Sequence, residues 1–264
     1  MSELANNPCL LSGRHILVTR PAEQAAPLCA LIRAAGGVPI AFPTVAIQPI
    51  QPADSARALL GARWDLIVFV SRNAVIQALA LLPERRLPDA TRIAAVGAGT
   101  ASALRAAGRA PDLIPDARFD SEGLLELPTL QQVAGQRILI VRGVGGRPLL
   151  GDMLTQRGAE VVYAEVYRRA LPNVDAVPLI PDWRAAALLL TATSDEVLNN
   201  LYRLIPEAEH PWLRGRPLAV FSQRTAATAM ELGFRTVAVA AESSDMALLD
   251  ALCRLLLQRP HEPR

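Results

Sequence analysis

The chain of 264 residues contains two copies of one pattern, and this internal repeat restricts its possible folds more than any other feature. The apolar segments GRHILVTR and GQRILIVR open the copies, about 122 positions apart, and both end in arginine. Each is followed by a helical pattern, a glycine and further apolar segments. The residues paired across the copies are Arg20 with Arg142, Gly36 with Gly158, Val75 with Val197, and Thr100 with Thr225. A repeat of this length indicates two related domains.

Within each copy, short segments rich in Val, Ile and Leu alternate with helical patterns of ten or more residues. This alternation is typical of parallel sheets that are covered by helices on both faces. The repeat therefore predicts two open α/β domains, each with a parallel sheet. Ligands of such sheets bind at the carboxyl ends of the strands, so we expect functional residues in the loops that follow the strands.

The segment 92–108, RIAAVGAGTASALRAAG, reads as strand, glycine turn and helix. Gly97 and Gly99 match two of the three glycines of a dinucleotide-binding loop, but the third position is not glycine. In the second copy, FSQRT replaces VGAGT, so that only a small polar turn and the Thr-Ala pair persist. We interpret the loop as a helix start whose backbone N–H groups attract an anion, with Gly97, Thr100 and Thr225 as contacts.

The basic side chains are all arginine, because the sequence contains no lysine. This excludes a Schiff-base lysine and the lysine of a phosphate-binding P-loop. The formal net charge of +2 gives no support to a nucleic-acid-binding role.

Three cysteines, Cys9, Cys29 and Cys253, show neither C-x-x-C nor zinc spacing, and the three histidines are scattered. We therefore expect no metal site, and a reduced, cytoplasmic protein. No apolar run reaches the length of a membrane span and no secretory signal is evident, so we expect no membrane partner.

Six segments spread over about residues 13–256 follow the order of a known family. They are ILVTRP, DLIVFVSRNAV, AAVGAGTASALRAAG, RILIVRGVGGRPLLGDMLTQRGAEVVYAEVYRR, TAATAMELGF and SSDMALLDAL. Together they resemble the uroporphyrinogen-III synthases, and the fourth segment is the most specific. The resemblance implies two α/β domains joined by a two-stranded linker. One domain would combine residues 1–44 with 171–264, the other would span 45–170, and the linker strands would lie at about 44–50 and 163–171.

The reaction implied by the resemblance converts hydroxymethylbilane to uroporphyrinogen III, with loss of water and inversion of ring D. It implies neither a metal nor an organic cofactor, and we expect a monomer. Two other functions fit the sequence: a non-catalytic two-domain receptor for an anionic small molecule, and a nicotinamide or flavin oxidoreductase that uses VGAGTAS.

The implied substrate carries carboxylates, which call for fixed cations and N–H donors at strand ends. Arg142 and Arg147 flank the glycines Gly143 and Gly146, which let the backbone approach a ligand closely. The further binding candidates lie where a strand gives way to a helix, and several of them would also cap that helix. These further candidates are Arg20, Ser71, Gly97, Thr100, Thr193, Ser194 and Thr225.

Tyr167 in EVYRR matches a tyrosine of the family pattern and is the candidate catalytic residue. Loss of hydroxide from the substrate is assisted by a nearby proton donor, and a tyrosine hydroxyl can serve as a general acid. The alternative interpretation is a half-buried aromatic residue of a strand.

Overall fold

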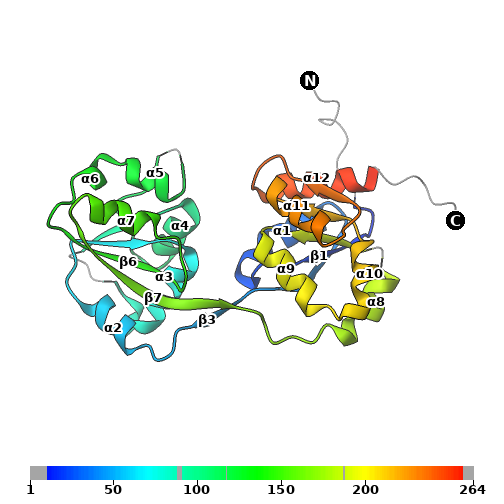
Figure 1. The fold of residues 1–264 in the computed structure, drawn as a ribbon, viewed down its shortest axis with the longest axis horizontal. Helices are drawn as coiled ribbons and strands as arrows, with labels where there is room; N and C mark the ends of the chain where they lie inside the picture. The colour runs from blue at the N-terminus through cyan, green and yellow to red at the C-terminus, as the bar shows by residue number, and fades with distance from the viewer. Residues whose placement is uncertain (1–10, 88–90, 117, 187, 258–264) are drawn as a thin grey trace, which may run out of the picture. The chain divides into compact units, whose positions relative to one another are not determined.

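The computed structural model describes residues 11–87, 91–116, 118–186 and 188–257 (Figure 1). Cys9, counted above, lies outside these ranges. The chain forms two compact units: unit 1 comprises Met1–Ala46 and Ala170–Arg264, and unit 2 comprises Ile47–Arg169. The chain therefore passes between the units twice. Among the described helices, none has the length and apolar character that crossing a bilayer requires.

Unit 2 is built on a five-stranded sheet in the order β3-β7-β6-β4-β5. Its strands are β3 (Ala46–Pro49), β4 (Leu66–Phe69), β5 (Arg92–Ala95), β6 (Arg137–Gly143) and β7 (Glu160–Ala170). Its helices are α2 (Asp54–Gly61), α3 (Arg72–Leu81), α4 (Ala98–Ala106), α5 (Ser121–Glu126), α6 (Pro128–Gln131) and α7 (Leu149–Gln156). The registers of β4 with β5, of β4 with β6, and of β6 with β7 are all parallel.

The sheet of unit 2 separates two hydrophobic cores, because successive side chains of a strand point to opposite faces. Ile67 and Phe69 belong to the core formed with α2, α3 and α4. Leu66 and Val68 belong to the core formed with α5, α6 and α7. A strand that is buried on both faces has to be apolar throughout, which explains the continuous LIVF of β4.

Unit 1 has a second five-stranded sheet, in the order β10-β9-β8-β1-β2. Its strands are β1 (His15–Val18), β2 (Val38–Ala41), β8 (Leu189–Ala192), β9 (Leu218–Val220) and β10 (Val237–Val239). Its helices are α1 (Ala22–Ala34), α8 (Ile180–Ala185), α9 (Asp195–Leu204), α10 (His210–Arg214), α11 (Gln223–Glu231) and α12 (Asp245–Leu257). One face packs against α1 and α12, where Ile16 and Leu189 meet the buried side chains of both helices.

Each sheet combines the first half of one sequence copy with the second half of the other. In unit 1, β1 and β2 from the first copy lie beside β8 and β9 from the second. In unit 2, β4 and β5 from the first copy lie beside β6 and β7 from the second. Equivalent strands hold equivalent places in the two sheets. The prediction of a two-domain α/β fold with parallel sheets is confirmed.

One detail of the repeat alignment is wrong by a single residue. The pairing of Val75 with Val197 also pairs Ser71 with Thr193. In the structure, Ser71 and Ser194 hold the equivalent positions, because each is the N-cap of the helix after its strand. The strands β4 and β8 start 123 positions apart, whereas Gly36 and Gly158 are 122 apart, so the second copy has one extra residue before β8 that a constant offset cannot represent.

Buried hydrogen bonds fasten the carboxyl end of the unit 1 sheet. The Thr191 hydroxyl donates to the Leu17 carbonyl at 2.9 Å, which ties β8 to β1. The Thr44 hydroxyl donates to the Val197 carbonyl at 3.0 Å, and the Asn200 amide donates to the Thr44 carbonyl at 2.9 Å. Because these groups are buried, each bond prevents an unsatisfied polar atom and fixes the chain just before it enters unit 2.

We predict that Asn200→Ala lowers the free energy of unfolding by about 1–3 kcal/mol, because it leaves the buried Thr44 carbonyl without this donor. Urea unfolding of the full chain measures the change. Asn199→Ala is the matched control, since Asn199 is the exposed neighbour on the same helix. That control should stay within about 0.5 kcal/mol of the parent. Equal losses in the two variants would contradict a role for the buried amide.

Candidate functional site

The carboxyl edge of the unit 2 sheet brings Ser71 and Tyr167 together, although 96 positions separate them in the chain. Ser71 follows β4 and caps α3, and its Oγ accepts the N–H of Ala74 at 3.1 Å. The same oxygen lies 3.1 Å from the Tyr167 hydroxyl, and either atom can donate. The serine therefore both starts a helix and holds the tyrosine.

Tyr167 points toward Ser71 because of an irregularity in β7. The register pairs Arg142 with Glu165 and Gly143 with Tyr167, so β7 has one extra residue, Val166, at this point. Such a bulge changes the face to which the following side chains point. As a result Val166 and Tyr167 both enter the core of α2, α3 and α4, and Tyr167 is only 4% exposed.

Gly143 is required by the tyrosine ring. A Cβ atom at this position would lie 2.6 Å from Cζ of Tyr167, far closer than atoms can pack. The sequence interpretation assigned this glycine to close approach of a ligand. The structure shows a second reason for glycine at this position, because any side chain would collide with Tyr167. Gly145, by contrast, has nothing within 4 Å of the place where a Cβ atom would lie.

Arg142 is held on the other face of β6. Its guanidinium donates to Glu165 Oε1 at 3.0 Å and to the Gly146 carbonyl at 3.1 Å. It also lies over the Tyr163 ring, 3.9 Å from the centroid, which fixes its plane. Its buried Nε has no hydrogen-bond partner among the described residues. Arg142, Tyr163 and Glu165 border a pocket of about 420 Å³ in unit 2.

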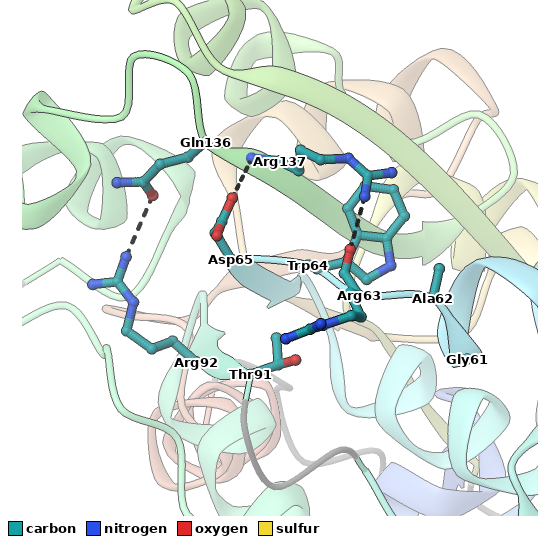
Figure 2. A pocket seen from close by; sticks show the side chains of 9 residues that line it. All are labelled: Gly61, Ala62, Arg63, Trp64, Asp65, Thr91, Arg92, Gln136 and Arg137. Atoms are coloured by element: carbon teal, nitrogen blue, oxygen red, sulfur yellow. Dashed lines mark hydrogen bonds between the residues drawn. The ribbon is translucent and has the colours of Figure 1, made fainter.

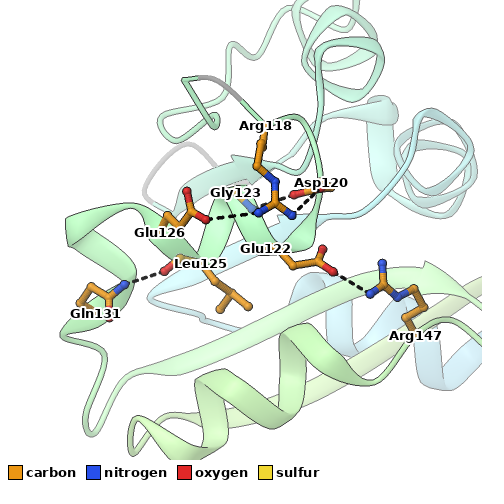
Figure 3. A network of polar contacts seen from close by, with 8 residues as sticks. All are labelled: Arg118, Asp120, Glu122, Gly123, Leu125, Glu126, Gln131 and Arg147. Atoms are coloured by element: carbon orange, nitrogen blue, oxygen red, sulfur yellow. Dashed lines mark hydrogen bonds and ion pairs between the residues drawn. The ribbon is translucent and has the colours of Figure 1, made fainter. Parts of the chain in front are cut away.

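Arg147 belongs to a polar network at the start of α5 (Figure 3). Its exposed guanidinium donates to Glu122 Oε1 at 2.7 Å, and this hydrogen bond is the largest influence lowering the pKa of Glu122. Asp120 caps α5 by accepting the Gly123 N–H at 2.7 Å. That backbone hydrogen bond is the main cause that lowers the pKa of Asp120, and Arg118 adds a smaller effect in the same direction.

In unit 1, Arg20 follows β1 and is almost completely buried. Its guanidinium donates to Asp245 Oδ1 at 2.6 Å and to the Gln24 carbonyl at 3.3 Å. It lies 5.5 Å from the centroid of the Phe221 ring, and its buried Nε has no partner among the described residues. A buried arginine with one unused donor is a fixed cation at the strand end.

The other candidates of unit 1 gather around Asp195 at the start of α9. Ser194 caps this helix, with its Oγ accepting the Val197 N–H at 3.3 Å, and Thr193 lies just before it, half-buried. The Thr225 hydroxyl donates to Asp195 Oδ1 at 2.7 Å, and Arg224 pairs with the other oxygen at 2.8 Å.

The prediction that Thr100 and Thr225 cap their helices is wrong. The caps of α4 and α11 are Gly97 and Ser222, whereas Thr100 and Thr225 lie in the first helical turn, buried. Each helix begins earlier than the Thr-Ala signal suggests. Gly97 also meets the backbone of Phe119, since a Cβ atom there would lie 3.3 Å from that carbonyl oxygen.

The structure thus places the predicted residues at the carboxyl edges of the two sheets, and it adds carboxylates that sequence reasoning missed. These acids pair with the candidate arginines and are Glu122, Glu165 and Asp245. Their distance from the arginines in the sequence gives no signal for the pairing. Among the described residues, no group of His, Cys, Asp and Glu is arranged to hold a metal ion.

Comparisons with known proteins identify the family that the chain resembles. The family model described as Uroporphyrinogen-III synthase HemD matches residues 26–250. The uroporphyrinogen-III synthase of Escherichia coli K12 is 40% identical over 249 residues, which cover 90% of this chain and 99% of that protein. The enzyme of Salmonella typhimurium LT2 is 39% identical over 244 residues, with the same coverage of 90% and 99%.

A solved structure has the same fold. The uroporphyrinogen-III synthetase of Helicobacter pylori 26695 superimposes with a TM-score of 0.60 at 15% identity. The match covers 92% of this chain and 99% of that one.

We predict that Gly143→Ala lowers the free energy of unfolding by about 1–3 kcal/mol, because the added methyl overpacks against Tyr167. Adding Tyr167→Ala should remove this penalty, and a double-mutant cycle in urea measures the coupling. Gly99→Ala is the control. Gly99 lies in α4, and a methyl group there would contact only the Arg72 side chain, at 3.8 Å. That change should be neutral or stabilising by up to about 1 kcal/mol. A cycle without coupling would show that the ring is not the obstacle.

We predict that Asp120→Asn reduces the dependence of stability on acid pH. Asparagine caps a helix as well as aspartate does, so mainly the charge is lost. Because folding lowers the pKa of Asp120, its charge stabilises the protein above the unfolded pKa of about 4, and this contribution disappears as the pH falls further. The difference in urea midpoint between parent and variant should therefore be largest near neutral pH and should disappear in acid. Asp116→Asn, which also removes one negative charge from an exposed position of unit 2, is measured over the same pH range for comparison. A constant gap for Asp120→Asn would refute the assignment.

Proposed function

The chain belongs to the uroporphyrinogen-III synthase family, and we propose that the loops at the carboxyl edge of each sheet bind substrate groups, with Tyr167 of unit 2 as proton donor. The chain cyclises hydroxymethylbilane to uroporphyrinogen III, with inversion of ring D and loss of water. The observation that supports Tyr167 is its hydroxyl 3.1 Å from Ser71, at the end of a strand in the loop region where α/β sheets bind ligands.

The first chemical step breaks the bond between carbon and the hydroxyl group of hydroxymethylbilane. The pyrrole nitrogen donates electrons and expels hydroxide, which leaves an azafulvene. A proton from a nearby acid lets hydroxide leave as water. The proton returns to the acid when the pyrrole carbon that closes the ring loses its hydrogen, so the cycle leaves the enzyme unchanged.

The tyrosine can act as this acid if its own proton remains available. Ser71 Oγ already accepts the Ala74 N–H, and its hydrogen is free to be donated to the Tyr167 oxygen. In that arrangement the Tyr167 proton is directed at the leaving hydroxyl, and Ser71 stabilises the tyrosinate that forms. Ser71 is therefore a positioning residue in this proposal. The burial of Tyr167 keeps water from competing for the proton.

Substrate carboxylates bind to arginines and helix starts. Arg20, Arg142 and Arg147 each have a carboxylate partner, so each guanidinium is oriented before the substrate arrives. Arg147 is the most accessible of the three, with 69% of its side chain exposed. The helix starts at Ser71, Gly97, Ser194 and Ser222 add N–H donors, with Thr100 and Thr225 in the first turns of α4 and α11. The other predicted contacts are Thr193, just before Ser194, and Gly143 and Gly146, at the end of β6 and in the loop after it. A monomeric state and a cytoplasmic location remain predictions.

We predict that Tyr167→Phe slows turnover at least about tenfold, the lower range expected for the loss of a general acid. The product should still be isomer III, because holding the chain for the inverting closure does not need the hydroxyl. A coupled assay that separates isomers I and III measures both quantities.

Tyr163→Phe is the matched control, since it keeps the ring that supports Arg142 and should keep turnover. Were Tyr167 only a core aromatic residue, its phenylalanine variant would retain full activity. A slow variant that yields only isomer I would make Tyr167 a positioning residue instead.

A further inference from the structure

A pocket of about 640 Å³ opens at the amino ends of β4, β5 and β6, at the other end of the unit 2 sheet from Tyr167 (Figure 2). Its lining includes three arginines from three separate strand starts, Arg63, Arg92 and Arg137. Trp64, Asp65 and Gln136 lie between them. None of these residues has a part in the proposed reaction, and the sequence alone does not bring them together.

The charge balance of this pocket is positive. Among the described residues, Asp65 is the only acidic one that lines the pocket, and one of its oxygens accepts the Arg137 backbone N–H at 2.8 Å. Glu160 approaches Arg137 at 3.5 Å, and both side chains are about half exposed, so this pair contributes little. With both acids counted against the three arginines, an excess positive charge remains at the pocket.

Two of the arginines are held in place by neutral groups. Arg137 lies over the buried Trp64 ring, 4.8 Å from the centroid, and donates to the Arg63 carbonyl at 3.1 Å. Arg92 donates to the amide oxygen of Gln136 at 3.3 Å, and no acidic partner for it is found in the described part of the chain. Arg63 has no partner for its guanidinium among the described residues. The pocket thus has oriented N–H donors whose charge other protein groups do not fully neutralise.

We propose that this pocket binds a multiply charged oxyanion, held between Arg63 and Arg92 with Arg137 at its side. Guanidinium forks match the oxygens of phosphates and carboxylates. Figure 2 shows the Arg63 side chain extending toward Thr91, while the Arg92 guanidinium lies beside Gln136 at the same pocket. The Trp64 ring is covered by Arg137, so it cannot stack on a base, and the described lining residues include no His or Cys to favour a transition metal. The ligand is therefore a small anion without an aromatic group. Because the site is separate from Tyr167, it is a candidate for an effector rather than a substrate.

Isothermal titration calorimetry of the full chain with inorganic pyrophosphate, and in a second arm with citrate, tests the proposal. The arm with the lower Kd identifies the ligand as a phosphate or a carboxylate compound. Arg63→Gln and Arg92→Gln should each raise that Kd about tenfold or more, as expected for loss of a charged hydrogen bond. Arg63→Gln is the safer variant for folding, because its side chain has no partner among the described residues.

Arg105→Gln is the matched control, since Arg105 is exposed in unit 2 and does not line the pocket. It should leave the Kd unchanged. Three results would overturn the proposal: no binding of either anion, a Kd that Arg63→Gln and Arg92→Gln do not alter, or an equal loss in Arg105→Gln. Because binding is measured directly, these results are independent of Tyr167 and of turnover.

Discussion

The pairing of strands from opposite copies of the repeat is the constraint on which the structure depends. A parallel strand needs a partner that runs in the same direction, and β1 finds it in β8, as β4 finds it in β6. Neither half of a copy can complete a sheet alone. The chain must therefore pass from unit 1 to unit 2 and back. Unit 2 is a continuous segment, whereas unit 1 is completed only when segments from before and after unit 2 meet. Such long-range pairing is slow to form, and it makes unit 1 depend on both parts of the chain.

This pairing also decides where chemistry is possible. All strands of a parallel sheet end at one edge, so loops that are far apart in sequence meet there. In unit 2 the ends of β4 and β7 place Ser71 beside Tyr167. In unit 1 the starts of α9 and α11 place Thr225 beside Asp195. The opposite edge of unit 2 gathers arginines in the same way, by the starts of β4, β5 and β6.

Arginine dominates both edges, and its geometry explains how a nearly neutral chain can recognise anions. Each candidate arginine at the carboxyl edges has a carboxylate beside it, which reduces the local charge but fixes the fork. A substrate carboxylate then replaces the protein carboxylate beside the arginine, or binds next to it. The arginine side chain is already ordered before the substrate binds. The cost of binding is lower when donors are already oriented. At the pocket of Arg63 and Arg92, neutral groups perform the same orientation without cancelling the charge.

The sequence by itself determined the fold class, because short, continuously apolar segments that alternate with helical patterns leave parallel sheets covered on both faces as the favourable packing. It also located Tyr167, Arg20 and the loops after the strands, through the repeat and the family resemblance. It did not determine that Thr100 and Thr225 lie inside helices, that Ser194 rather than Thr193 matches Ser71, or that Glu122, Glu165 and Asp245 face the arginines. The pairs of arginine and carboxylate depend on contacts between segments more than 20 positions apart, and the orientation of Tyr167 depends on the one extra residue in β7. Local pattern reports which face of an element is buried, whereas only the packed sheet decides which side chains from different elements meet there.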